Sequence, residues 1–482
     1  MRTVLLSAIL AIAAGLVAPA GAAEKPNIVI LLADDLGWQD VSYHGSPIRT
    51  PRIDALAKEG VELDQFYVFP VCSPTRAGLM TGRYPIRYGA MRTVFPPWRA
   101  GGLDTSEVTL ANVLAEAGYA QRGVFGKWHL GHSDVKYHPL RRGFTEFYGH
   151  YNGAVDYFSH EREGELDWHR GYEPSYDKGY STDLIAREAS RFIRDAARSG
   201  SPFLCYVPFN AAHSPFQAKP EDLAPYKDLQ AVPGDWGGNA AARLKNRRIL
   251  GGMVAGLDHG VGEILDAIDE AGVRESTLLF FFSDNGGVGG ISSNEPLRGA
   301  KATAFEGGTR VPAIARWPGR LQGGRKVTAP LAVIDMLPTL MALTGVKDSH
   351  GKPLDGRNVW PLLTGEQKTL DRELYSYIGA AGEDTEQVAY RDGPWKLVVA
   401  GPNLADPNAD DSLRTRYLFR LDRDPNETTN LADKEPARVK AMYAKAKAFR
   451  ELQPPGGVPP YGEGKEGFVA PKEWKIPGAP GQ

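Results

Sequence analysis

Short and mostly apolar runs recur between residues 27 and 282 of this chain, and polar residues follow each run. Aliphatic and aromatic runs of this length are typical of strands that are buried on both faces of a parallel sheet. The pattern therefore predicts strands at Asn27–Ala33, Ala120–Phe125, Phe203–Val207 and Thr277–Phe282.

Segments with helical periodicity lie between these strands. Their apolar positions are three or four residues apart, and residues that favour helix ends, such as Thr, Pro and Gly, bound them. Because strand and helix alternate, we expect an α/β protein with a large, mostly parallel or mixed central sheet flanked by helices. The predicted helices are Thr50–Gly60, Thr109–Gly118, Ser181–Arg198 and Ala240–Ala271.

The pattern changes after about Arg372. Short segments there alternate apolar and polar residues and are separated by turn residues, which is typical of an antiparallel sheet. An amphipathic helix at Ala437–Leu452 follows them. The predicted strands are Leu374–Ile378, Gln387–Arg391, Trp395–Val399 and Tyr417–Leu421.

The length of the chain predicts two domains, because 482 residues exceed what one hydrophobic core usually supports. We expect a larger domain with the candidate chemistry at residues 24–371 and a smaller C-terminal domain at residues 372–453. Residues 454–482 are rich in Pro and Gly, which predicts a tail that is extended over the surface or disordered.

The N-terminal residues 1–23 are predicted to be a signal peptide. Arg2 supplies a positive charge, Val4–Val17 is apolar, and small residues offer a cleavage site after it. That apolar run is too short for a membrane span, and no later run reaches the required length. We therefore expect an exported bacterial protein, periplasmic or secreted, with no membrane anchor. The net charge of −2 indicates no nucleic-acid partner.

Polar clusters follow each predicted strand of the larger domain. Because the carboxyl ends of parallel strands meet at one edge of a sheet, these clusters are expected to form a single site. Any one cluster alone would be weak evidence. They are Asp34 with Asp35, Lys127 with His129, His213, and Asp284 with Asn285.

Two of these clusters predict a metal site. Asp34, Asp35, Asp284 and Asn285 offer only oxygen donors, which suit Ca²⁺ or Mg²⁺, and a cage with several carboxylates favours Ca²⁺. The alternative for Asp-Asn-Gly-Gly alone is a plain turn.

The basic residues of the clusters predict an anion site. Lys127, His129 and Lys301 supply positive charge for a tetrahedral anion, and His213 is a second imidazole that can transfer a proton. Taken singly, such residues are more often structural or solvated.

The candidate nucleophile is Cys72. Pro74 and the residues after it predict a short helix, so Cys72 would lie at a helix N-terminus, where the backbone favours an anionic nucleophile, with Arg76 on the same side. The alternative is a half-buried cysteine before an ordinary helix. Cys205, inside a predicted strand, is most simply a small buried hydrophobic residue.

The sequence Cys72-Ser-Pro-Thr-Arg76, followed by Leu79-Met-Thr-Gly-Arg-Tyr84, resembles the signature of type I, formylglycine-dependent sulfatases of the alkaline-phosphatase-like superfamily. Further segments resemble motifs of that family in its order, so the resemblance covers about residues 25–435. They are Leu32–Trp38, Gly126–Gly131, Ser283–Gly287, Leu297–Lys301, Glu306–Pro312 and Asp424–Leu431.

Three other segments are most similar to the arylsulfatase B branch, the N-acetylgalactosamine-4-sulfatases, although the cysteines of that enzyme are absent here. They are Arg141–Phe144, Asp156–Glu161 and Pro353–Gly356.

The resemblance implies a site around a modified Cys72. A formylglycine-generating enzyme would oxidise this cysteine to formylglycine (3-oxoalanine), which works as its hydrate. One hydroxyl of the hydrate would attack sulfur, and Arg76 would hold the hydrate in place. The implied ligands of one Ca²⁺ are Asp34, Asp35, Asp284, Asn285 and the modified residue 72.

The resemblance also implies the remaining roles. Lys127 and Lys301 would bind sulfate oxygens, His213 with Lys301 would protonate the departing alcohol, and His129 would take a proton from the second hydroxyl so that sulfate leaves. The implied activity is hydrolysis of sulfate esters, with a sulfated polysaccharide or oligosaccharide of galacto-type sugars as substrate.

Candidate sugar contacts come from two segments, the aromatic-rich Tyr148–Tyr176 and the loop Phe95–Arg99. Aromatic faces stack on sugar rings, so both segments predict a saccharide site. The alternative is that these rings only pack the loops down. The candidate residues are Trp98, Arg99, Asp156 and His160.

Two other functions are compatible with the sequence. The first is a phosphate or phosphonate ester hydrolase of the same superfamily, because its members handle phosphoryl groups with similar metal ligands. The second is an inactive carbohydrate-binding relative. Against the second, no catalytic-motif position that we compared is replaced.

Overall fold

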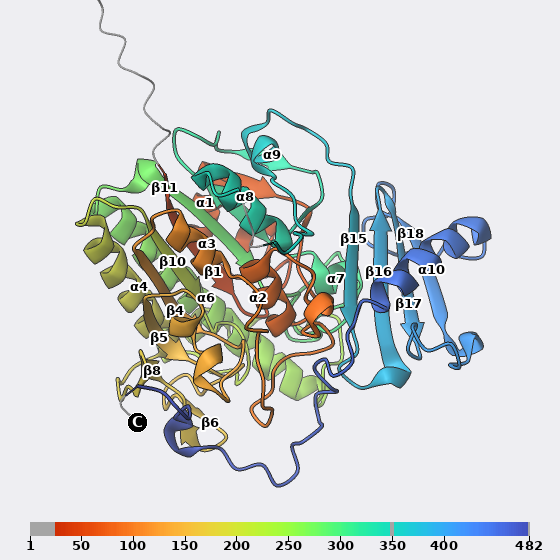
Figure 1. Cartoon of the computed structure of the whole chain (residues 1–482), viewed down its shortest axis with the longest axis horizontal. Coiled ribbons are helices and arrows are strands. Elements are labelled where there is room, and N and C mark those ends of the chain that lie inside the picture. The colour runs from red at the N-terminus through yellow and green to blue at the C-terminus, as the bar shows by residue number, and fades with distance from the viewer. Residues whose placement is uncertain (1–24, 348–350, 481–482) are drawn as a thin grey trace, which may run out of the picture.

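The computed structural model describes residues 25–347 and 351–480, so the predicted signal peptide lies outside the described residues. The centre of the molecule is a ten-stranded mixed sheet with the order β13-β2-β12-β11-β1-β10-β4-β5-β8-β9 (Figure 1). Its strands are β1 Asn27–Ala33, β2 Val61–Leu63, β4 Gln121–Lys127, β5 Glu146–His150, β8 His169–Arg170, β9 Glu173–Pro174, β10 Phe203–Pro208, β11 Thr277–Ser283, β12 Ala313–Arg316 and β13 Arg325–Val327.

The middle of this sheet is parallel. Strands β11, β1, β10, β4 and β5 run in one direction, whereas β12 runs against β11. Every residue of β1 is buried, and alternate side chains such as Ile28 and Val29 enter two different apolar clusters on the two faces. Because both faces of β1 are buried, nearly all of its side chains are apolar. The predicted α/β class is confirmed.

Helices cover both faces of the sheet (Figure 1). Side chains of α1, α4 and α6 belong to the cluster on one face, and side chains of α2, α3 and α8 belong to the cluster on the other. The helices are α1 Pro51–Glu59, α2 Cys72–Thr81, α3 Leu110–Glu116, α4 Ser181–Ala197, α5 Pro220–Leu223, α6 Ala240–Glu270, α7 Glu306–Thr309, α8 Met336–Thr344, α9 Trp360–Thr364 and α10 Pro436–Arg450.

Local signals set the ends of these helices close to the predicted positions. The Thr109 hydroxyl accepts a hydrogen bond from the Asn112 amide and so caps α3. Gly82 ends α2 with a φ of 65°, in the left-handed region that glycine tolerates best, and a Cβ there would lie 3.1 Å from carbon atoms of Leu337 and Leu354.

A second, four-stranded antiparallel sheet lies beside the main one and is covered by α10 (Figure 1), as the sequence predicted. Its apolar side chains, among them Tyr377 and Leu397, belong to the same cluster as Ile28 of β1. Because the core continues between the two sheets, the division near residue 372 stays a prediction. The strands are β15 Glu373–Ile378, β16 Glu386–Asp392, β17 Trp395–Gly401 and β18 Thr415–Arg420.

Residues 454–480, which we call the C-terminal strap, run from α10 across the surface to the strand pair β6 (Glu161–Arg162) and β7 (Glu165–Leu166) (Figure 1). The strap consists mostly of turns and irregular segments, and two of its side chains, Trp474 and Ile476, are almost fully buried. These apolar anchors hold it against the body of the protein.

A buried ionic cluster links the small sheet to the segment that follows Lys301. Lys396 Nζ of β17 lies 2.8 Å from Glu306 Oε1 and 3.0 Å from Glu427 Oε1. Burial raises the pKa of Glu427 to about 7; the charge of Lys396 opposes this shift and that of Glu306 adds to it. Lys396 is therefore a shared partner of two buried carboxyl groups, and Arg310 lies 3.9 Å from Glu306 as well.

Replacing Lys396 by Met is expected to destabilise the protein by roughly 3–5 kcal/mol, because removing one partner of a buried ion pair leaves a charge uncompensated. The measurement is the free energy of unfolding in urea. The double variant Lys396→Met/Glu427→Gln should lose less free energy of unfolding than Lys396→Met alone. The control is Lys445→Met, which removes an exposed pair with Glu373 and should have little effect. Equal losses for the two lysine variants would contradict the role of the cluster.

Candidate active site

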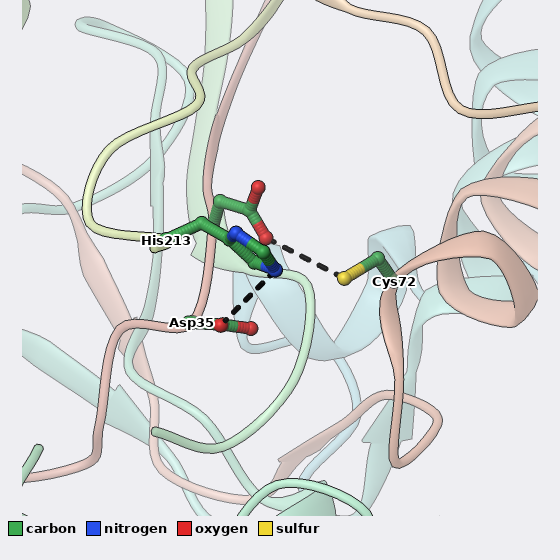
Figure 2. Close-up of side chains that lie close together, drawn as sticks. Asp35, Cys72 and His213 are labelled. Carbon is green, nitrogen blue, oxygen red and sulfur yellow. Dashed lines mark hydrogen bonds and ion pairs between the residues drawn. The ribbon is translucent and has the colours of Figure 1, made fainter. Parts of the chain in front are cut away.

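Cys72 is the first residue of α2 and lies at the wall of a cavity of about 490 Å³. Asp35, His129, His213 and Lys301 line the same cavity. Figure 2 shows Asp35 and His213 close to the Cys72 side chain. The helix predicted after Cys72 is therefore present, and it brings this cysteine to the polar clusters.

The strand ends converge as the sequence predicted. Asp34 and Asp35 follow β1, Lys127 ends β4, and Asp284 follows β11. The backbone is strained at two of the turns, because Asp35 and His129 have φ angles of 59° and 56°. Such left-handed conformations of non-glycine residues cost on the order of 1–3 kcal/mol each and cluster at functional sites.

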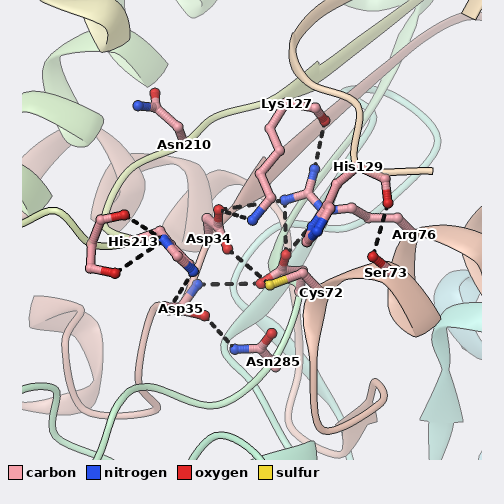
Figure 3. Close-up of polar contacts among 12 residues, drawn as sticks. Asp34, Asp35, Cys72, Ser73, Arg76, Lys127, His129, Asn210, His213 and Asn285 are labelled. Atoms are coloured by element: carbon pink, nitrogen blue, oxygen red, sulfur yellow. Dashed lines mark hydrogen bonds and ion pairs between the residues drawn. The ribbon is translucent and has the colours of Figure 1, made fainter. Parts of the chain in front are cut away.

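Arg76 ties α2 to three of these strand ends. Its Nε and Nη2 donate to Asp284 Oδ2 at 3.1 and 2.8 Å, and its Nη1 donates to the Lys127 carbonyl oxygen at 2.7 Å. Nη2 also lies 3.9 Å from Asp34 Oδ2. The guanidinium is fully buried, so its charge is compensated entirely by these groups (Figure 3).

Two buried lysines complete the charge pattern. Lys127 Nζ donates to Asp34 Oδ2 at 2.5 Å, and Lys301 Nζ donates to Asp35 Oδ2 at 2.7 Å. Burial and the neighbouring Asp284 raise the pKa of Asp34 to about 7, against the charge of Lys127. Burial also acts to raise the pKa of Asp35, but Lys301, His213 and Lys127 outweigh it and lower that pKa.

The unmodified Cys72 thiol is held in its neutral form. Its Sγ donates to Asp34 Oδ1 at 3.5 Å. Burial, together with the charges of Asp284 and Asp34, raises the pKa of the thiol despite Lys127 and Lys301. Desolvation and these carboxylates therefore oppose the effect that the helix N-terminus was expected to have on this thiol.

The two imidazoles lie on either side of Cys72 in the view of Figure 3. His213 Nδ1 donates to the Ser214 carbonyl oxygen at 2.6 Å, so its Nε2 faces Asp35 Oδ2, 3.6 Å away. The pKa of His213 is lowered mainly by burial and, to a smaller extent, by the charge of Lys301. The pKa of His129 is lowered mainly by burial and, to a smaller extent, by the charge of Lys127. Both rings are therefore neutral at pH 7.

Gly153 makes room for the His129 ring. A Cβ at this glycine would lie 2.4 Å from Cε1 of His129, so the loop after β5 reaches the imidazole only because residue 153 has no side chain. The Ser73 hydroxyl donates to the His129 carbonyl oxygen at 2.9 Å (Figure 3) and fixes the backbone of His129 to α2.

The donor set fits a hard divalent cation. Asn285 Oδ1 is buried and has no hydrogen-bond partner among the described residues, while its Nδ2 donates to Asp35 Oδ1 at 2.7 Å. Ligand atoms of Asp34, Asp35, Cys72 and His213 lie within 4.8 Å of one another. Asp284 is not part of this group of four. Its carboxylate accepts hydrogen bonds from Arg76 and from the Asp35 amide. Carboxylate and amide oxygens suit Ca²⁺ or Mg²⁺.

The four predicted sugar contacts lie outside the cavity wall in the described structure. Trp98 donates through Nε1 to the Tyr461 carbonyl oxygen, and Arg99 pairs with Glu463 on the surface. His160 is buried, with its ring stacked 4.5 Å from that of Trp168.

Asp156, the last of the four, accepts hydrogen bonds from the backbone amides of Phe158 and Ser159 and so shapes its own loop. In the described structure these side chains contact neighbouring loops, and their role in sugar binding stays a prediction.

Other residues form the wall of the cavity beyond the charged cluster. Phe216 and Trp236 come from the loops between β10 and α6, Arg162 from β6, and Tyr461 from the C-terminal strap. Sequence reasoning missed these residues. Trp236 lies among glycines and prolines, and Tyr461 belongs to a segment that composition alone marks as a loose tail, so neither carried a local signal.

In the parts of the chain that the structure describes, none of the helices has both the length and the apolar character needed to cross a membrane.

Comparisons with known proteins agree with this geometry. Residues 26–346 match the family described as Sulfatase, and residues 300–451 match the C-terminal region of N-sulphoglucosamine sulphohydrolase. N-acetylgalactosamine-6-sulfatase of Mus musculus is 35% identical over 86% of this chain and 83% of its own length. The likeness to the arylsulfatase B branch stays a prediction.

Solved structures share the fold. The structure titled Ps i-CgsB is 31% identical, has a TM-score of 0.80, and is matched over 92% of this chain and 96% of its own. A second structure of it is titled as a complex with k-i-k-neocarrahexaose. Phosphonate monoester hydrolase of Agrobacterium radiobacter shares the fold alone. It is 21% identical, has a TM-score of 0.64, and is matched over 89% of this chain and 96% of its own. The family match over most of the chain shows that the protein belongs to the sulfatase family, whose members are sulfuric ester hydrolases.

Proposed function

We propose that this sulfatase hydrolyses sulfate esters of a sulfated oligosaccharide or polysaccharide, with Cys72 converted to formylglycine and with one bound Ca²⁺. The observation that carries the proposal is the position of Cys72, which shares a cavity wall with Lys301, His129 and His213 and lies beside the buried Lys127 and Arg76. A sulfate ester resists hydrolysis because its anionic oxygens repel nucleophiles, and a cluster of fixed cations offsets that repulsion.

Conversion of Cys72 resolves a chemical problem of the site. A buried thiol next to carboxylates is a poor nucleophile, because the thiolate is the reactive form. As its hydrate, formylglycine supplies two hydroxyl groups on one carbon, of which one can attack sulfur and the other can drive release of sulfate. Arg76, fixed by Asp284, lies one turn further along α2 and would hold the hydrate.

The metal would be held by Asp34, Asp35, Asp284 and Asn285, and its charge would favour the ionised nucleophile and a sulfate oxygen. The unpartnered Asn285 Oδ1 supports this assignment. Lys127 Nζ donates a hydrogen bond to Asp34, and Lys301 Nζ donates one to Asp35. Because an ammonium group has three donors, both retain capacity for sulfate oxygens.

The two imidazoles would move protons at different steps. His213 Nε2 points to the cavity, and with Lys301 it would donate a proton to the departing alcohol. An anionic ester beside it favours the protonated ring that this requires. His129 is neutral and would accept the proton that releases sulfate.

A saccharide substrate is supported by the relatives. One is named for a sulfated amino sugar, and a solved neighbour is titled with a carrageenan-type hexasaccharide. A cavity of about 490 Å³ lies in the range of small-ligand sites. We also propose that residues 1–23 direct export to the periplasm or beyond, and that a formylglycine-generating enzyme acts on the chain during maturation.

The proposed activity predicts that the purified protein cleaves nitrophenyl sulfate faster than nitrophenyl phosphate, because the alternative, a phosphate or phosphonate hydrolase, has the opposite preference. Cys72→Ala should abolish turnover of the sulfate without changing the melting temperature by more than a few degrees. The matched control is Cys205→Ala, in the interior of β10, which should retain turnover. Faster cleavage of the phosphate, or full activity in Cys72→Ala, would contradict the proposal.

The metal assignment predicts stoichiometric calcium in the purified protein, measured by elemental analysis. Asn285→Ala removes the unpartnered oxygen and should lower both the calcium content and the melting temperature, and added calcium should restore the melting temperature of chelator-treated wild type. Asp266→Asn, which alters an exposed pair with Arg52, is the control. Stoichiometric zinc, or normal calcium content in Asn285→Ala, would overturn the assignment.

The proton-transfer roles predict different dependence on the leaving group. A sugar alkoxide needs a proton in the transition state, worth on the order of 10²–10⁴ in rate, whereas nitrophenolate leaves almost unaided. His213→Ala should therefore slow the first step far more with a sulfated saccharide than with nitrophenyl sulfate. His129→Ala should slow sulfate release with both. Single-turnover kinetics measures the steps. Equal first-step losses of His213→Ala on both substrates would remove His213 from the acid role.

A further inference from the structure

The C-terminal strap reaches the substrate cavity at Tyr461. Its backbone is fixed there by three hydrogen bonds: Val458 N donates to Gly89 O at 2.7 Å, Tyr461 N donates to Ala380 O at 3.0 Å, and Trp98 Nε1 donates to Tyr461 O at 3.0 Å. The rings of Trp98 and Tyr461 meet edge to face at 5.1 Å. The predicted sugar contact Trp98 thus supports a residue that lines the cavity.

The far end of the strap anchors the strand pair β6–β7. Trp474 is almost fully buried, and its Nε1 donates to the Arg162 carbonyl oxygen at 2.9 Å. The neighbouring Glu473 amide donates to Glu165 Oε2 at 2.9 Å. The strap therefore fixes the backbone of Arg162, a residue of the cavity wall.

Arg162 has unused hydrogen-bonding capacity. Its side chain is about 23% exposed, and its Nη2 lies 3.1 Å from Oε1 of the partly exposed Glu163. Its Nε is buried and lacks a hydrogen-bond partner in the described part of the chain. Among the described wall residues, the other fixed charges, Asp35 and Lys301, are bonded to each other. Arg162 is thus the wall cation that is not engaged by the catalytic cluster.

The rest of the wall suits a sugar ring. Phe216, Trp236 and Tyr461 line the cavity together with several Pro, Val and Ala residues, and Trp236 is about half exposed. Aromatic faces of this kind pack on the apolar face of a sugar. A ligand that spans the cavity would have its scissile sulfate at Lys301 and another part of the saccharide near Arg162.

We propose that Arg162, positioned by the C-terminal strap, is a specificity-determining residue that binds a second anionic group of the saccharide. This inference rests on the proposed function. The group is a carboxylate of a uronic acid or a second sulfate ester, because a guanidinium binds the oxygens of either in a bidentate manner. The strap supplies Tyr461 to the wall and, through Trp474, holds the arginine in place.

The test compares three synthetic disaccharides: one with a single sulfate and no other charge, one with an added uronate, and one with a second sulfate. Wild type should prefer at least one of the doubly anionic substrates in kcat/KM. Arg162→Gln should reduce that preference about tenfold or more, because hydrogen bonds to charged groups are the stronger ones. The substrate whose preference falls identifies the group.

Arg141→Gln, which removes an exposed arginine outside the cavity wall, is the control and should keep the wild-type preference. A preference unchanged in Arg162→Gln, or a wild type that favours the singly charged disaccharide, would overturn the inference. Failure of wild type to cleave nitrophenyl sulfate would instead overturn the proposed function, so the two failures are distinguishable.

The positioning role of the strap has its own test. Trp474→Phe keeps an aromatic ring but removes the donor to the Arg162 carbonyl, so KM for the preferred disaccharide should rise several-fold while kcat is retained. Trp317→Phe removes an equivalent indole donor, to the Glu275 carbonyl oxygen at 2.9 Å, from a residue outside the cavity wall, and should leave KM unchanged. Equal KM values for the two variants would refute the positioning role.

Discussion

The structure of the active site depends on the compensation of six buried charges at the carboxyl ends of the parallel strands. Arg76, Lys127 and Lys301 face Asp34, Asp35 and Asp284 within hydrogen-bonding distance, so three cationic groups face three carboxyl groups. A buried charge without a partner costs several kcal/mol, and none of these residues can be removed without leaving one. Arg76 has the central position, because it joins α2 to the ends of β4 and β11 and thereby sets where Cys72 lies.

In the proposed mechanism, this compensation would let the site receive a doubly charged cation and an anionic ester together. The two added charges would be of opposite sign, and each would find partners that the fold already holds in place: carboxylate and amide oxygens for the metal, ammonium groups for the ester. Preorganised charges of this kind need no rearrangement during the reaction. The strained backbone at Asp35 and His129 is consistent with side chains whose directions are imposed by the fold.

Most of the fold and the charged site could be predicted from the sequence, since their signals are local. The apolar run at 27–33 reports burial on both faces, and parallel strands bring Asp34, Lys127 and Asp284 to one edge whatever the detailed packing. The neutral Cys72 thiol could not be predicted, because its pKa depends on carboxylates from distant segments. Arg162 and Tyr461 were missed for the same reason: a hairpin and a Pro- and Gly-rich tail reach the cavity only through contacts such as that of Trp474.

The central claim is that formylglycine at position 72, within this charge cluster, is the group that attacks the sulfate ester. The most direct measurement compares enzyme preparations that carry different fractions of aldehyde, obtained by varying the formylglycine-generating enzyme during expression. The aldehyde fraction is measured by peptide mass spectrometry, and turnover of nitrophenyl sulfate is measured per total enzyme. The account predicts turnover proportional to the aldehyde fraction and zero at zero aldehyde. Turnover that is the same at every aldehyde fraction would contradict it.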